Sequence, residues 1–265
     1  MAEERMTAVE QDDSSLVGQP VPAGEAGEAM ELMRDYMRWL QSLDSFTCVY
    51  DQMVDYKDGS REELELRVDV RMPGKMKITD TARPNTPLLV CDGSSLAIRD
   101  SLDGGYVMAP ASPTLGETYT TNSAGLLLTY WWDARGADWM PRVGLPPEEL
   151  ISQSFHDWDI RWSLGDVETI EGVECHRIVE ATLHPMSGVR VDHTESWLSV
   201  DDPTRMIRAV SDVSYGMEYE SYERPGALGM TDVARIETHY HTFTPNASLA
   251  EDTFDLRPAA TGAPN

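Results

Sequence analysis

The strongest pattern in this chain is a strict alternation of apolar and charged residues between Arg61 and Met72. Leucine, valine and methionine occupy every second position from Leu64 to Met72, and glutamate, aspartate and arginine fill the positions between them. Successive side chains of a β-strand point to opposite faces, so this spacing predicts a strand with one apolar and one solvated face. A sheet that is dry on one side and wet on the other is typical of antiparallel strands.

Similar alternating runs recur along the chain and are separated by short turn sequences such as Asp92-Gly93-Ser94. Such turns connect antiparallel neighbours, so the pattern favours a meander with short links. The runs that predict strands, about ten in all, are Phe46–Val54, Arg61–Met72, Lys75–Thr79, Leu88–Cys91, Leu96–Arg99, Tyr106–Met108, Asp159–Val167, Val173–Thr182, Arg190–Val200, Arg205–Tyr215 and Val233–Phe243.

The period changes between Gly24 and Leu43, where apolar residues recur every three or four positions. Met30, Met33 and Met37 belong to this series, which predicts one helix with a single apolar stripe. The helix should end near Leu43, because alternation begins again just after it.

The meander is interrupted between Ser112 and Phe155. Asn122 or Ser123 can cap a helix that carries Trp131 and Trp132, and Leu145–Ile151 has proline in its first turn, as short helices often do. An apolar helical insert must be buried, and the dry face of the sheet is the available place. We therefore predict an α+β fold in which a single curved antiparallel sheet forms an unclosed half β-barrel, with helices plugging its concave face.

Composition divides the chain into one domain and two flanking segments. Residues 1–23 are acidic and rich in Gly, Pro and Ser, which predicts a disordered leader; 24–258 form the half-barrel domain, and 259–265 form a flexible tail. The leader has no apolar signal core, so the chain is either cytoplasmic or is a mature form that lacks its export signal.

Charge excludes several classes of partner. The formal net charge is −25, from 46 acidic and 21 basic residues. Binding to nucleic acid or to an anionic membrane surface needs a basic patch, so neither is expected. No run of apolar residues is long enough to span a membrane.

Catalytic signatures are missing from the sequence, so we predict no catalytic residue, no metal and no cofactor. His239 and His241 with Glu237 could offer ligands to a metal together with His193 or Asp192, but Arg235 on the same face favours a solvated outer surface. Asp157 and Asp159 favour a cap at a strand entrance over acid–base work. Cys48, Cys91 and Cys175 are expected to be ordinary buried cysteines, although Cys91 could be a reactive thiol.

The apolar residues support a better hypothesis, which is a cavity that holds an apolar ligand. Methionine is flexible and suits surfaces that accept varied apolar partners, while a filled core is the alternative for each position. The candidate cavity residues are Met33, Met37, Leu64, Leu66, Val68, Val70, Trp131 and Trp132.

Taken in order, several segments resemble the lipoprotein-carrier superfamily typified by LolA and LolB, and most closely its DUF2092-type members. The resemblance covers about residues 28 to 258. The segments that carry it are Tyr36–Phe46, Arg71–Met76, Val90–Leu96, Leu145–Ile151, Glu171–His176, Ser196–Leu198 and Asn246–Phe254.

This resemblance implies an unclosed barrel with an apolar cavity for acyl chains and a periplasmic or otherwise extracytoplasmic location. The partner would be a lipid or a lipidated protein, held without catalysis. Two alternatives stay open: a protein-interaction or envelope-sensor module that uses the same cleft, and a small-molecule enzyme with a polar pocket around His193, His239 and His241. The sequence leaves the oligomeric state open.

Overall fold

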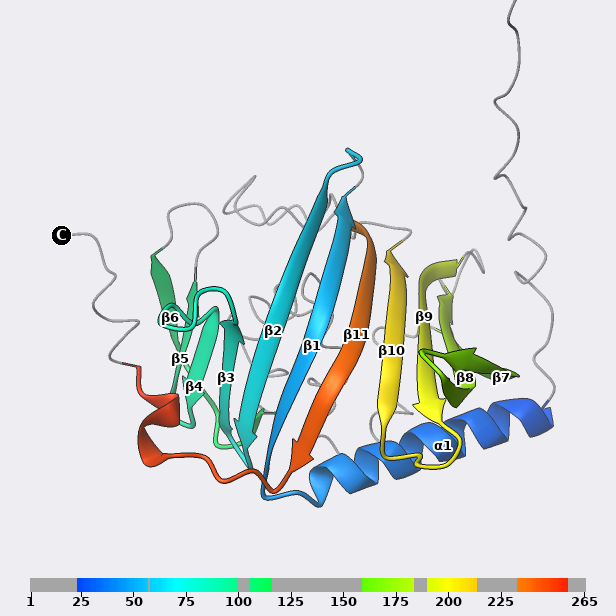
Figure 1. The fold of residues 1–265 in the computed structure, drawn as a ribbon, viewed down its shortest axis with the longest axis horizontal. Helices are drawn as coiled ribbons and strands as arrows, with labels where there is room; N and C mark the ends of the chain where they lie inside the picture. Colours follow the sequence, from blue (N-terminus) through cyan, green and yellow to red (C-terminus); the bar gives the residue numbers. More distant parts are fainter. Residues whose placement is uncertain are drawn as a thin grey trace, which may run out of the picture.

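The described part of the chain forms one open antiparallel sheet of eleven strands with a long helix across one end (Figure 1). This computed structural model describes residues 23–56, 58–99, 105–115, 159–183, 190–213 and 233–256. The helix is α1 (Ala23–Gln41). The strands are β1 (Ser45–Tyr56), β2 (Arg61–Arg71), β3 (Lys75–Asp80), β4 (Leu89–Asp92), β5 (Ser95–Arg99), β6 (Tyr106–Pro110), β7 (Asp159–Ile170), β8 (Val173–Leu183), β9 (Arg190–Ser199), β10 (Met206–Val213) and β11 (Val233–Pro245), followed by a 3-10 turn, η4 (Glu251–Phe254).

The strand order is β6-β5-β4-β3-β2-β1-β11-β10-β9-β8-β7, so β6 and β7 are the edge strands among the described residues. Every neighbouring pair is antiparallel, and all pairs except β1 with β11 are consecutive described strands of a meander. The predicted unclosed sheet is therefore confirmed, and its eleven described strands each overlap one of the runs that predict strands.

The centre of the sheet joins the first strand to the last. Phe46 of β1 lies opposite Pro245 of β11, and pairing continues to Tyr56 opposite Val233. Beyond the strand ends, the Ser45 hydroxyl donates to the Ala247 carbonyl at 2.8 Å, across 202 residues of chain. Two meanders, β1–β6 and β7–β11, are thus fused along one long seam.

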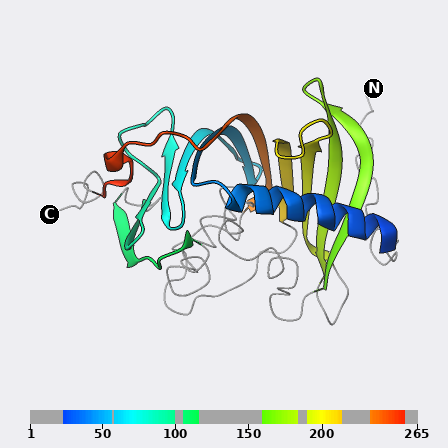
Figure 2. The same ribbon diagram turned by 90° about the horizontal axis from the view of Figure 1, so that it is seen from below.

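The sheet curves, and α1 runs beneath the ends of β10, β9, β8 and β7 (Figures 1 and 2). The helix begins at Ala23 and ends at Gln41, close to the predicted bounds, and Leu43 remains buried just beyond it. Its methionine stripe faces the sheet, with Met33 and Met37 buried. Burial of this stripe supplies much of the stability that an isolated helix lacks in water.

The predicted faces of β2 are confirmed, with one exception. Leu66, Val68 and Val70 are fully buried, while alternate residues such as Arg67 are exposed. Asp69 lies on the charged face yet is only 6% exposed. Its carboxylate accepts hydrogen bonds from the Thr47 hydroxyl at 2.7 Å and from Arg67 at 2.9 Å. The Arg67 side chain covers it, which a strict alternation rule cannot foresee.

The predicted helices of the insert, the leader up to residue 22 and the tail after residue 256 lie outside the described residues. Asp157 and the whole of residues 116–158 do so as well. Among the described residues, no helix is long and apolar enough to cross a membrane.

Candidate ligand-binding face

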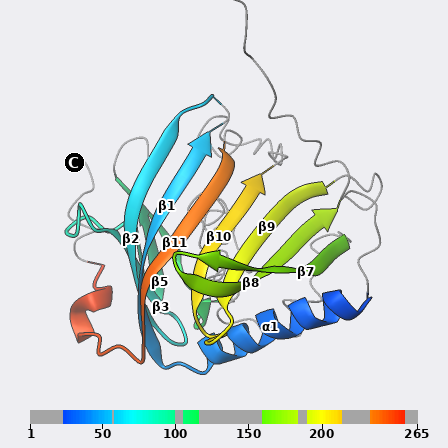
Figure 3. The ribbon, with the colours of Figure 1, turned by 45° about the vertical axis from the view of Figure 1, so that its right-hand side comes forward.

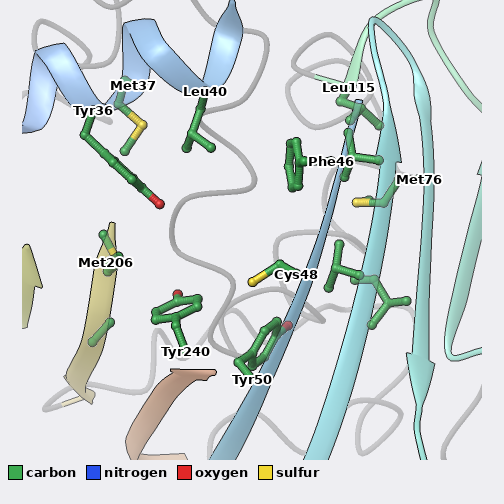
Figure 4. Packing of buried hydrophobic residues seen from close by; sticks show 14 of the residues in the cluster. Tyr36, Met37, Leu40, Phe46, Cys48, Tyr50, Met76, Leu115, Met206 and Tyr240 are labelled. Atoms are coloured by element: carbon green, nitrogen blue, oxygen red, sulfur yellow. The ribbon is translucent and has the colours of Figure 1, made fainter. Parts of the chain in front are cut away.

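The inner face of the sheet and the buried side of α1 share one continuous apolar cluster. It takes in residues from α1, from β1 to β5 and from β7 to β11 (Figure 4). Six predicted cavity residues meet there: Met33 and Met37 from α1, with Leu66, Val68 and Val70 from β2 buried in it and Leu64 packed partly against it. Trp131 and Trp132 lie outside the described residues, so their role stays a prediction.

Several members of this cluster were not among the predicted cavity residues. Tyr36 of α1 and Cys48 of β1 both point into the space between helix and sheet (Figure 4). Burial raises the pKa of both groups above their ordinary values, and the nearby Cys48 thiol adds to the effect on Tyr36. Spacing in the sequence could have found them, because Tyr36 continues the helical stripe from Met33 and Cys48 continues the alternation of β1.

Aromatic residues line the middle of the face. The Tyr50 ring of β1 lies 5.6 Å from the Tyr240 ring of β11, centre to centre, and the two residues are register partners. Phe46 stacks on Phe243 at 5.1 Å, and Trp39 of α1 lies at the same distance from Phe243. Such pairs hold the end of α1 against the β1–β11 seam.

Farther from α1, the inner face carries several buried, neutral polar side chains. Gln52 of β1 faces Thr238 of β11, and both are 1% exposed. On the neighbouring strands Ser196 and Ser211 are buried too, and the Ser211 hydroxyl lies 3.0 Å from the hydroxyl of Thr194. We call these five residues the polar band. Along β1 and β11 the inner face therefore carries an apolar region beside α1, then these buried neutral polar residues, and then the small apolar cluster of Val54 and Ile236.

The outer face carries the charged side chains, including the two histidines of β11. His239 lies with Nδ1 2.8 Å from Glu171 and Nε2 2.8 Å from Glu237. The Nε2 of His241 is 2.8 Å from Asp51. Both rings are thus engaged by carboxylates on the solvated side, away from the apolar cluster. No group of side chains in the described part of the chain is arranged to hold a metal ion.

Glu237 is the most strongly held carboxylate of this group. Burial alone would raise its pKa, but the hydrogen bond with His239 and the adjacent Arg208 guanidinium outweigh burial, and the pKa lies below its ordinary value. Arg208 Nη2 is 2.6 Å from Glu237. The arrangement is that of a structural ion network, in which Glu237 contacts His239, Arg208 and Arg235.

The three cysteines are free and buried, as predicted. The Cys91 thiol donates to the Gly74 carbonyl at 3.1 Å, and burial raises its pKa to about 11. A buried thiol with a raised pKa is a poor nucleophile, so the alternative of a reactive Cys91 is not supported.

No family model matches this sequence. No curated protein matches it either. Among solved structures, the chain is similar to the Mycobacterium tuberculosis lipoprotein LppX, with 12% identity over 84% of this chain and 98% of that chain, at a TM-score of 0.42. LprF from Mycobacterium bovis matches at 12% identity over 85% and 96% of the two chains, with a TM-score of 0.38.

A LolA superfamily protein from Nitrosomonas europaea matches at 11% identity over 87% of this chain and 97% of that chain, with a TM-score of 0.32. The superfamily resemblance drawn from the sequence and its narrower DUF2092-type assignment both stay predictions. These likenesses are distant, so the function is argued below from the packing and chemistry of this chain.

Proposed function

We propose that this protein is a non-enzymatic binding protein that holds a lipid, or the acyl chain of a lipoprotein, against the inner face of its open sheet. The observation that carries the proposal is the succession of a large apolar cluster and a polar band along the inner face. A large apolar cluster beside α1 is followed along the same strands by the neutral polar band. An amphiphile has the same order of parts, an apolar chain and a polar head.

The apolar end suits an acyl chain for a physical reason. Each methylene taken out of water contributes about 0.8 kcal/mol, so a long chain needs no charged or catalytic partner to bind tightly. The flexible side chains of Met33, Met37 and Met206 lie in the cluster where α1 meets the sheet. Methionine can change rotamer at low cost, so these residues can make room for a chain that enters beside the helix.

The polar band suits a neutral head better than a charged one. Gln52, Thr238 and the hydroxyls of the band carry no formal charge, and a buried ion without an opposite charge is costly. We expect ester, hydroxyl or amide groups to lie there. The resemblance to LolA-like carriers adds an extracytoplasmic location to the proposal.

Native mass spectrometry of the purified protein, followed by lipid extraction, tests this function. We expect co-purifying acyl species at near one per chain, or uptake of added fatty acid or phospholipid by the apo protein. Met37→Trp should reduce uptake, because it fills the space beside α1. Met108→Trp is the matched control, since Met108 lies on the edge strand β6 and is 52% exposed. A protein that stays apo with every added lipid would overturn the proposal.

A further inference from the structure

The β7–β8 hairpin bends back so that its tip covers the outer face of the sheet (Figure 3). Ile170 and Val173, on either side of the turn, pack against a second apolar cluster formed by Cys175, Trp197, Ile207 and Val210. The pairing of β7 with β8 shifts between Leu164 and Val167, a bulge of the kind that bends a strand. The tip thereby passes β9 and β10 and reaches β11.

Two carboxylates fasten this tip. The Trp197 indole N–H donates to Glu168 at 3.1 Å, and Arg177 lies 3.5 Å from the same carboxylate. Glu171, in the turn itself, reaches His239 of β11 at 2.8 Å. Glu171 and Gly172 both have positive φ, +52° and +82°, as the two central residues of a tight hairpin turn of type I′ do.

His239 stands between two carboxylates, and this geometry depends on its protonation. A neutral imidazole has a single N–H, so it can donate to one oxygen only, whereas the imidazolium donates from both nitrogens. Both ring nitrogens lie 2.8 Å from carboxylate oxygens. Only the doubly protonated ring satisfies Glu171 and Glu237 together.

The two arginines near His239 contact Glu237 and not Glu171. Arg208, the register partner of His239 on β10, and Arg235 on β11 both approach Glu237, at 2.6 and 3.8 Å. Asp51, the register partner on β1, is engaged by His241. Asp212 is engaged by Arg235. Loss of the second imidazole proton therefore weakens the contact between His239 and Glu171 in the hairpin turn.

We propose that His239 is a proton-dependent latch for the β7–β8 hairpin tip. When the imidazole carries both protons, it clamps Glu171 and holds the tip over the second apolar cluster. When it carries one, the ring stays with Glu237 and Arg208, and the tip is held by Glu168 and apolar contact alone. Histidine is the side chain whose charge changes near physiological pH, so the latch loosens as the pH rises.

The latched hairpin includes β7, the strand that also packs against α1. Trp162 of β7 belongs to the inner cluster and Leu164 packs against it, as do the buried residues of α1. One edge strand thus links the outer latch to the helix across the inner face. The latch itself stands on the contacts of the outer face and does not depend on the proposed lipid ligand.

Cys175 offers a reporter, because it is fully buried in the second apolar cluster and belongs to the hairpin. We would measure its labelling by N-ethylmaleimide with peptide-resolved mass spectrometry, using Cys91 as an internal reference. The measured quantity is the Cys175 rate in His239→Gln divided by the rate in the unmodified protein at the same pH. This division removes the thiol's own pH dependence.

We expect this ratio to be near one at about pH 8 and to rise roughly two- to fivefold at about pH 6. That rise corresponds to the free energy that a partly exposed ion pair contributes. Glu171→Gln should behave in the same way. His241→Gln is the matched control: it removes a histidine–carboxylate contact two residues away, and its ratio should stay near one at both pH values. A His239→Gln ratio that does not change with pH, or a control that changes equally, would overturn the latch.

Discussion

The guanidinium of Arg208 lies over the indole ring of Trp197, with 4.8 Å between Cζ and the ring centre. The two residues are register partners on β10 and β9, at a point where the pairing shifts by one residue. The same guanidinium also holds Glu237 at 2.6 Å. Arg208 therefore joins the second apolar cluster to the ion network of β11, and its planar shape allows both contacts at once.

Arg208→Gln should lower the free energy of unfolding by about 1 to 2 kcal/mol, because it removes the cation–π contact and one partner of a partly buried carboxylate. Arg235→Gln is a suitable comparison, since Arg235 is 3.8 Å from Glu237 and more exposed. Urea denaturation of both variants measures the difference. Equal losses would show that the contact with Trp197 contributes nothing.

Glu237 gives the fold a predictable dependence on pH. Its pKa in the folded protein is below the ordinary value of 4.5, so its contribution to stability is fully present above that value and is lost as the pH falls through the lower, folded value. The stability gap between the unmodified protein and Glu237→Gln should be present near neutral pH and shrink in acid. Denaturation curves over a series of acidic pH values check this, and a gap that widens in acid would contradict it.

Leu66→Ala should cost about 2 to 5 kcal/mol of unfolding free energy, because Leu66 is fully buried in the inner cluster and leaves a cavity there. Leu64→Ala, two residues earlier on the same face, should cost less, since Leu64 is only partly buried. Thermal or urea unfolding measures both. Similar costs at the two positions would mean that the inner cluster is loosely packed around β2.

Thiol chemistry should distinguish the native from the unfolded protein. All three cysteines are free and buried, and burial raises the pKa of each thiol. We expect slow reaction with a thiol reagent in the native state, with Cys175 the fastest, and rapid reaction of all three in denaturant. A disulfide, or rapid native labelling of Cys48, would contradict the packing described here.

Much of the fold follows from local patterns in the sequence. The alternation in Arg61–Met72 and the methionine stripe of α1 identify their elements and their buried faces, because each pattern reports contact with one continuous core. Hairpin turns such as Asp92-Gly93-Ser94 then set the order of neighbours. The pairing of β1 with β11 has no comparable local signal, since its cause is the meeting of segments far apart in the chain.

The outer face shows where such patterns fail. Alternation correctly places Glu237, His239 and His241 on the charged side, and it indicates a solvated surface. It cannot show that the β7–β8 hairpin folds over that surface and brings Glu171 to His239, because a bulge and the curvature of the sheet decide this. Alternation also fails to predict the burial of Asp69 under Arg67, because long side chains cover their neighbours.

The seam between β1 and β11 also bears on how the chain reaches its native state. Each meander consists of hairpins that can form from nearby residues, whereas the seam joins Asp44 and Asn246, 202 residues apart. Contacts at such separation form late, since a long loop must close before they yield any stabilisation. A nascent chain would therefore expose β1 and β10 as unpaired central strands until β11 arrives, and during that interval β1 is open to pairing with another chain.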